Sequence, residues 1–221
     1  MKKFLIIVLI LIIVAFGVII VAFYNLDSKT NEILDDYRSI YTNTKYDQTI
    51  LIENIKTIKQ EVSCGYAVIE MFAKWNDNYD ITEESLYEKY GGVVTSTGKS
   101  FEKEMNKQFS DYTTTMYKYL KSSELIDKVY DSLSNRIPVP FEWAAKSNNE
   151  WTLHYSLIIG IDVQEDKITI ANPYGETEKI NIKEFLDRTS FISYDNMPLF
   201  IKLGFAFGMF EKNTIFIVEK I

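Results

Sequence analysis

The N-terminal part of the chain carries its longest run of apolar positions. Residues 4–24 contain no charged side chain and one glycine, Gly17. At about 1.5 Å per residue, this run can cross the roughly 30 Å hydrocarbon core of a bilayer as a helix. A secretory signal peptide usually has a shorter apolar core that ends at small residues, whereas this run ends in Val-Ala-Phe-Tyr-Asn. We therefore predict an uncleaved membrane anchor over residues 1–24, in contact with the lipid bilayer through residues 4–24.

The charges on either side of this run predict its orientation. Lys2 and Lys3 precede it, whereas the residues that follow are mainly acidic, with only Lys29 opposing Asp27, Glu32, Asp35 and Asp36. Because basic residues tend to stay on the cytoplasmic side, we expect a cytoplasmic N-terminus and an extracellular C-terminal domain, as in a single-pass protein of the cell membrane.

Residues 25–54 have a mixed pattern. Apolar side chains recur at helical spacing in its first part, at Ile33, Leu34, Tyr37 and Ile40. This spacing predicts a stalk helix that ends near Thr44, followed by turns and a short apolar run over residues 49–52. We interpret residues 25–54 as a partly helical linker and residues 55–221 as one domain.

The first half of that domain has mainly helical periodicity. Helices are predicted over residues 64–76, 82–90, 100–109 and 122–133. Glu83 and Glu84 suit the first turn of the second helix, and Gly91 suits its end. The threonine-rich residues 112–119 have a strand-like pattern.

The second half changes to a β-rich pattern. We predict strands over residues 137–141, 152–163, 167–171 and 178–182, and a final hairpin formed by residues 200–207 and 214–218. Pro138 and Pro140 favour an edge position for the first of these strands, and Asn181 with Glu184 resembles a capping box that opens a short helix. Helices followed by antiparallel strands predict an α+β domain with the residue 64–76 helix packed on a sheet.

Composition limits the possible chemistry. The 221 residues carry a net charge of −7 and include one cysteine and one histidine. A single cysteine forms no internal disulfide, and one Cys with one His cannot build a usual zinc site. An acidic domain is a poor partner for nucleic acid. We expect no metal, no other cofactor and no nucleic acid partner.

The single cysteine, Cys64, opens the most apolar helix predicted for the domain. The free amides and the dipole at a helix N-terminus stabilise a thiolate. The alternative is a small buried hydrophobic residue, because free cysteines are often buried.

Three further residues would complete a thiol site. His154, near the start of a predicted strand, could exchange protons with Cys64, and Asn172, at the end of the next strand, could orient the imidazole. Gln60 could donate to an oxyanion beside the Cys64 amide. Simple register counting places Asn172 near Gly160 or Ile158, so a bulge, twist or longer turn would have to bring it to His154.

The same residues carry a family resemblance over residues 55–188. The matching segments are Gln60, Cys64 to Ala67, Pro138-Val139, His154 to Asp162, and Ile168 to Gly175. They resemble the papain-fold double-glycine leader peptidases, family 39 of the cysteine peptidases. The resemblance implies a papain-like fold and a thiol hydrolase with Cys64, His154, Asn172 and Gln60 in its site, acting on a peptide or protein substrate.

The chain departs from the family pattern at two of these positions. Gln60 precedes the cysteine by only four residues, and Asn172 stands where the family commonly has Asp. A catalytically inactive papain-like ectodomain that binds a peptide or a partner protein is therefore an alternative, because a fold does not fix a function. Acyl transfer by the same thiol is a third possibility.

Overall fold

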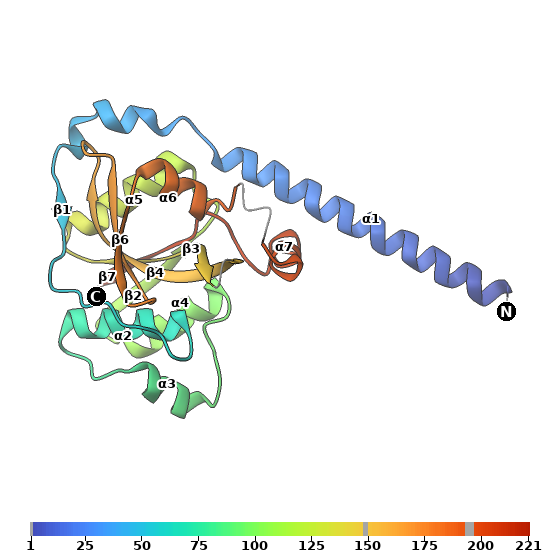
Figure 1. Cartoon of the computed structure of the whole chain (residues 1–221), viewed down its shortest axis with the longest axis horizontal. Coiled ribbons are helices and arrows are strands. Elements are labelled where there is room, and N and C mark those ends of the chain that lie inside the picture. The colour runs from blue at the N-terminus through green and yellow to red at the C-terminus, as the bar shows by residue number, and fades with distance from the viewer. Residues whose placement is uncertain (1, 148–149, 193–196) are drawn as a thin grey trace.

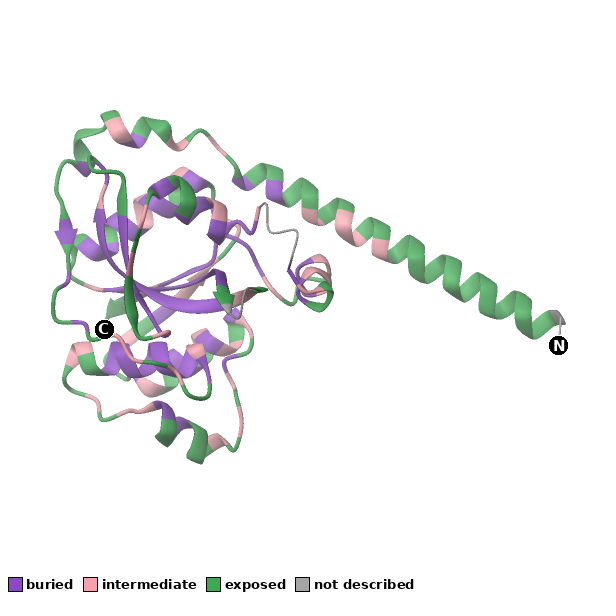
Figure 2. Ribbon diagram, viewed as in Figure 1, coloured by how far each residue is buried: buried purple, intermediate pink, exposed green. Residues whose placement is uncertain are grey.

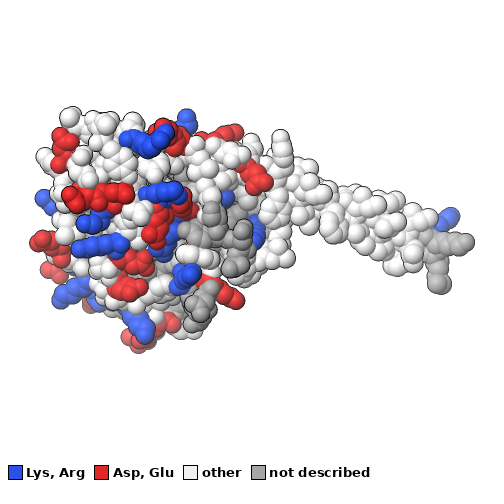
Figure 3. Space-filling model, turned by 45° about the horizontal axis from the view of Figure 1, so that its top comes forward, with Lys and Arg blue, Asp and Glu red and all other residues white. Residues whose placement is uncertain are grey.

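The computed structural model describes residues 2–147, 150–192 and 197–221, and its most prominent feature is a long N-terminal helix. Helix α1, Lys2–Ile33, projects from a rounded domain (Figure 1). Among the described residues it is the one helix long and apolar enough to cross a membrane. Figure 3 shows charged side chains over the domain, whereas the projecting part of α1 carries none until its N-terminal end.

The predicted stalk helix is wrong in part. α1 continues without a break to Ile33, and the rest of the linker forms two 3₁₀ turns, Tyr37–Thr42 and Thr44–Tyr46. The side chain of Asp36 accepts a hydrogen bond from the Arg38 amide, and the side chain of Asn43 accepts one from the Lys45 amide. These caps favour short new turns over a continuing helix.

The four helices predicted for the first half of the domain are confirmed within two residues at each end. They are α2, Cys64–Asn76, α3, Glu83–Tyr90, α4, Gly98–Gln108, and α5, Ser122–Ser134. Thr82 and Thr97 form capping boxes at the starts of α3 and α4, and Gly91 ends α3 in the left-handed conformation. These local signals are visible in the sequence, which is why the helix ends are predicted well.

An antiparallel sheet forms the centre of the domain. Its strands are β1, Ile50–Leu51, β2, Tyr112–Tyr117, β3, Val139–Ser147, β4, Glu150–Asp162, β5, Lys167–Asn172, β6, Glu176–Ile180, and β7, Ile215–Lys220. Their order is β2-β7-β3-β4-β5-β6, and β1 pairs with β4. In Figure 1, α2, α3 and α4 lie on one side of this sheet, and α5 and α6 lie on the other. The α+β prediction is confirmed.

The edge position predicted for the strand that contains the two prolines is wrong. β3 lies inside the sheet, between β7 and β4. Its pairing with β7 is confined to Phe141 and Ile215, however, so that Pro140 needs no N–H on that side. Pro138 precedes the strand, and Pro140 is tolerated because it lies where β3 is paired along one side only.

The last predicted hairpin is also wrong. Residues 199–206 form helix α7, Leu199–Ala206, and only β7 of the expected pair is a strand. Ile201 and Phe205, four residues apart, are buried with Phe191 and Met197 in a small apolar cluster against which Leu26 of α1 packs. Packing on α1 thus favours a helix in a segment whose composition is also compatible with a strand. The preceding helix α6, Ile182–Thr189, begins at Asn181 as predicted.

Candidate active site

The thiol of Cys64 lies at the first residue of α2. Ser63 is the N-cap of this helix, and the residues from Gly65 to Ala73 are all buried (Figure 2). α2 packs against β4, and the Tyr155 backbone in β4 acts to lower the pKa of the Cys64 thiol. The cysteine is therefore fixed next to the strand residue that follows His154.

Burial dominates the electrostatics of this thiol. It raises the pKa of Cys64 from 9.0 to about 11, although hydrogen bonds from the Tyr155 and Gly65 backbones act in the opposite direction. The charge of the buried Glu142 carboxyl adds to the increase. The direction is opposite to that expected from the helix N-terminus alone, because the desolvation of the thiolate outweighs the favourable amides.

A β-bulge decides whether His154 and Asn172 can meet. The pairing of β4 with β5 runs from Asp162 opposite Lys167 to Gly160 opposite Thr169, and then shifts by one residue, so that Ile158 lies opposite Ile170. Without this shift, the Asn172 side chain would lie on the face of the sheet opposite to that of His154. With it, Asn172 and His154 lie on the same face, as diagonal neighbours on adjacent strands.

The imidazole and the amide are in direct contact. His154 Nε2 lies 2.9 Å from Asn172 Oδ1, and both residues are buried. Asn172 Nδ2 donates to Glu178 Oε1 over 2.6 Å, and Asn172 Oδ1 also accepts the Tyr174 amide at 3.0 Å. These two partners fix which end of the amide is the oxygen.

The orientation of the amide determines the tautomer of the imidazole. Because Oδ1 of Asn172 is an acceptor, Nε2 of His154 must be the donor, and Nδ1 keeps its lone pair as the basic atom. The Tyr174 ring stacks on the imidazole with centroids 4.4 Å apart. Burial, followed by the charge of Arg188, lowers the pKa of His154 from 6.5 to about 4, against the opposing effect of the Asn172 hydrogen bond. The imidazole is therefore neutral at pH 7.

The hydrogen-bonded chain continues beyond Asn172. Glu178 Oε2 lies 3.1 Å from Arg188 Nη1, and Arg188 Nε donates to the Ala144 carbonyl over 2.8 Å. The guanidinium lies 3.5 Å from the centroid of the Trp143 ring. The orienting amide is thus held by a partly buried ion pair that joins β6, α6 and β3.

Gln60 lies beside the residues that follow β5 and contacts them through its backbone. Its backbone N–H donates to the Pro173 carbonyl over 2.7 Å, next to the bridge between Lys59 and Tyr174. Its side-chain Oε1 is buried and has no hydrogen-bond partner in the described part of the chain. Rotation of the amide by 180° replaces this acceptor with a donor.

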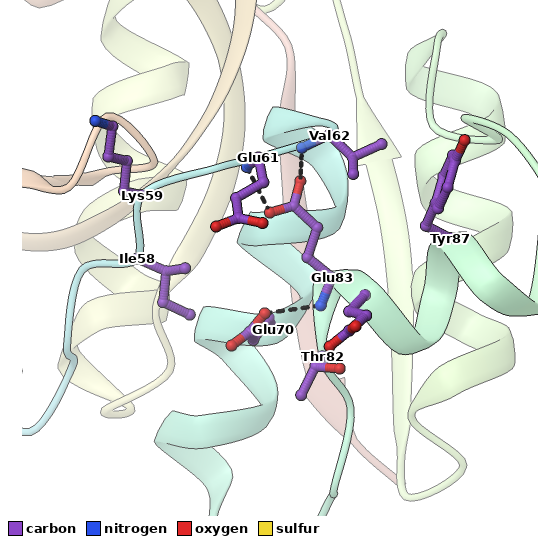
Figure 4. A pocket seen from close by; sticks show the side chains of 9 residues that line it. Ile58, Lys59, Glu61, Val62, Glu70, Thr82, Glu83 and Tyr87 are labelled. Carbon is purple, nitrogen blue, oxygen red and sulfur yellow. Dashed lines mark hydrogen bonds between the residues drawn. The ribbon is translucent and has the colours of Figure 1, made fainter.

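Glu83 holds the segment between Gln60 and Cys64. Its carboxylate accepts the backbone N–H groups of Glu61, Val62 and Ser63 at 2.9, 2.8 and 2.5 Å (Figure 4). Its own N–H donates to Glu70 Oε2 over 2.7 Å. Glu83 also lines a hollow of about 510 Å³. The start of α2 is therefore attached to the start of α3 by one buried side chain.

Replacing Glu83 with glutamine is expected to lower both stability and the rate of any reaction at Cys64. The amide can accept fewer than three N–H groups, and each buried donor left unpaired costs about 1–3 kcal/mol. For a protein of this size, each kcal/mol lost from the free energy of unfolding lowers the melting temperature by roughly 2–4 °C. Thermal unfolding of the full chain in detergent measures the effect. The exposed neighbouring Glu84→Gln variant is the control, and equal melting temperatures for the two variants would contradict the role of Glu83.

The structure brings His154 and Asn172 together and places Cys64 beside the His154 strand. No hydrogen bond between Cys64 and His154 occurs among the described residues. Sequence reasoning missed Glu83, Tyr174, Glu178 and Arg188. Only Glu83 had a local signal, its place in the first turn of a helix, and that signal indicates a helix start rather than a contact with residues 61–63.

Comparisons with known proteins identify the family of this chain. The peptidase C39-like family model matches residues 52–197. A solved double glycine motif protease from an AMS/PCAT transporter, in complex with the leader peptide, is similar at 14% identity and a TM-score of 0.48, covering 79% of this chain and 99% of the protease chain. No curated protein sequence matches. Because the family model spans most of the domain, the chain belongs to the peptidase C39-like family of papain-fold cysteine peptidases.

Proposed function

We propose that this protein is a membrane-anchored, outward-facing cysteine peptidase that cleaves peptide or amide bonds with Cys64, His154 and Asn172. The observation that carries the proposal is the 2.9 Å contact between His154 and Asn172, in which the other partners of the amide fix the imidazole tautomer. This tautomer leaves Nδ1 of His154 as the base for a thiol at the adjoining end of α2.

In the proposed reaction the proton moves as the thiol attacks. His154 Nδ1 takes the proton of Cys64 Sγ, the sulfur forms a bond to the substrate carbonyl carbon, and the carbonyl π electrons move to the oxygen. The Cys64 amide and the Gln60 side chain stabilise that oxyanion. The imidazolium then protonates the leaving amine as the C–N bond breaks. In the second half, water loses a proton to His154 as its oxygen attacks the thioester carbonyl carbon. The C–S bond then breaks to release the carboxylic acid, and the imidazolium returns a proton to the Cys64 sulfur.

A neutral resting pair is the starting state of this mechanism. Burial raises the pKa of Cys64 and lowers that of His154, and both directions disfavour the thiolate–imidazolium pair. Attack therefore requires general-base help from His154 rather than a thiolate already formed.

Alkylation of Cys64 with iodoacetamide is expected to be slow at pH 7 and to accelerate about tenfold per pH unit up to pH 10, because only the thiolate reacts and its pKa is raised to about 11. The single cysteine makes the measurement unambiguous. Unfolded protein is the control and should titrate near the ordinary thiol pKa of about 8.5. A rate that is already constant between pH 6 and 7 would indicate an ion pair and contradict the neutral state.

The activity is tested by trapping the acyl-accepting thiol. The full chain in nanodiscs is incubated with a set of peptides that carry an electrophilic C-terminal group, and adducts are located by mass spectrometry. We expect an adduct on Cys64 that is lost when the matching uncleaved peptide competes. Cleavage of unmodified peptides by the wild type and none by Cys64→Ala would support the peptidase activity. Binding of these peptides without cleavage would contradict it.

The second candidate function is peptide or partner binding by an inactive domain. The high pKa of Cys64 and the absence of a Cys64–His154 hydrogen bond among the described residues favour it. This candidate requires that capture of a peptide survive Cys64→Ser with no product formed by the wild type. Acyl transfer to an added amine would instead appear as a new product of the wild type.

The anchor and its orientation are part of the proposal. An uncharged run of 21 residues supports a membrane span, and the lysines before it support a cytoplasmic N-terminus. A protease added to intact cells should digest the domain. Digestion only after the membrane is permeabilised would show that the domain faces the cytoplasm and contradict the proposed orientation.

A further inference from the structure

Helix α7 has one buried face and one exposed apolar face. Ile201 and Phe205 are buried, whereas Leu199 and Phe200 are 68% and 69% exposed. Two further apolar side chains, Phe207 and Met209, are exposed in the turn that follows. This turn is fixed to the helix, since Phe207 N donates to the Leu203 carbonyl over 2.9 Å and Met209 N donates to the Gly204 carbonyl over 2.8 Å.

α7 lies beside the end of the apolar run of α1. The two helices pack together, and α7 is the part of the domain that reaches farthest along α1 toward its N-terminal end (Figure 1). The half-buried positions of α1 in this region are Ile19, Ala22, Phe23 and Leu26 (Figure 2). Their spacing defines one helix face, so the domain covers α1 along this face.

This position decides what surrounds the exposed side of α7. Ile19, Ala22 and Phe23 belong to the uncharged run that ends at Tyr24. If that run crosses a bilayer, its last turns lie at the boundary between hydrocarbon and headgroups. An element packed beside these turns lies at the same depth, where large apolar side chains contact lipid rather than water.

We propose that α7 and the turn after it, residues 199–209, are seated in the interfacial layer of the bilayer that α1 crosses. The inference rests on the membrane anchor of the proposed function. The occupant of the exposed face is lipid because that face is continuous with the apolar run of α1. Two attachments, α1 and α7, then hold the domain in one orientation against the membrane.

Site-directed labelling of the full chain in phospholipid nanodiscs tests this contact. In a Cys64→Ser background, single cysteines replace Phe200 in α7, Leu11 in α1, or Tyr87 in α3 and carry an environment-sensitive fluorophore. Tyr87 is also exposed and belongs to α3, which lies apart from α7 and α1 in Figure 1. Lipids with a spin label near the headgroup or within the acyl chain, and aqueous iodide, serve as quenchers. A second position, Met209→Cys in the turn after α7, controls for a local effect at residue 200.

The expected result is lipid quenching at positions 200 and 209, with loss of iodide quenching, and the reverse at position 87. Lipid quenching at 11 but aqueous behaviour at 200 and 209 would overturn the α7 contact and leave the anchor intact. Aqueous behaviour at position 11 would overturn the anchor itself. A third outcome is an apolar fluorescence signal at position 200 that shows no lipid quenching and depends on the protein-to-nanodisc ratio. It would indicate that a second copy of the chain covers the exposed face of α7, and it would also overturn the proposal.

Discussion

Replacing Cys64 or His154 with alanine is expected to reduce kcat by at least about 10³-fold while the domain stays folded. Cys64 supplies the atom that bonds to the substrate, and His154 is needed as the base that accepts its proton, because desolvation raises the pKa of this half-buried thiol to about 11. Losses of this size are typical when one member of a catalytic triad is removed. Turnover of a peptide substrate and circular dichroism of each variant measure the two effects.

The double variant separates a shared mechanism from two unrelated defects. Residues that act as one unit have non-additive effects, so Cys64→Ala with His154→Ala should be no slower than Cys64→Ala alone. His154→Gln adds a structural control, since its amide can still donate to Asn172 but cannot act as the base. Full activity in His154→Gln would exclude imidazole chemistry, and unchanged turnover in Cys64→Ala would exclude the thiol.

Replacing Asn172 with aspartate is expected to lower kcat by roughly 10–100-fold, although the double-glycine leader peptidases that the sequence resembles commonly have aspartate at this position. Asn172 Nδ2 lies 2.6 Å from a carboxylate oxygen of Glu178. An aspartate would place two carboxylates against each other there, which disfavours the charged pair. The amide is the group that can accept from His154 and donate to Glu178 at the same time. A misplaced orienting group costs rate because it disturbs the imidazole tautomer.

The partner substitution should restore the activity. In Asn172→Asp with Glu178→Gln, the negative charge moves from residue 178 to residue 172, and the new glutamine can donate where Glu178 accepted. We expect kcat of the double variant to exceed that of Asn172→Asp, with KM little changed. Glu176→Gln, exposed on the same strand, is the control. A double variant as slow as the single one would show that Glu178 does not select asparagine at this site.

Helix α7 and the residues that support Asn172 are connected through β3. Arg188 joins Glu178 to the Ala144 carbonyl, and Ala144 belongs to the apolar cluster that contains Ile201 and Phe205 of α7. Packing of α7 on α1 and the support of Asn172 therefore share one strand. Substitutions in α7 should be tested for activity as well as for membrane contact.

Local signals in the sequence determine much of this protein. The uncharged run, the start of α2 at Cys64, the ends of α3 and the Asn181 cap are all set by neighbouring residues, and each is predicted correctly. The succession of helices and strands gives the α+β class for the same reason. His154 and Asn172 are identifiable because the chain has one histidine and because Asn172 ends the next strand.

Tertiary structure decides the remainder. A single extra residue between Ile158 and Gly160 turns Asn172 to the His154 side, and no local pattern specifies that bulge. Glu83, Glu178 and Arg188 act through partners 6 to 44 positions away. α7 is a helix because it packs on α1, where the sequence favoured a strand. The pKa of Cys64 depends on desolvation by the surrounding domain, which its position at a helix N-terminus does not describe.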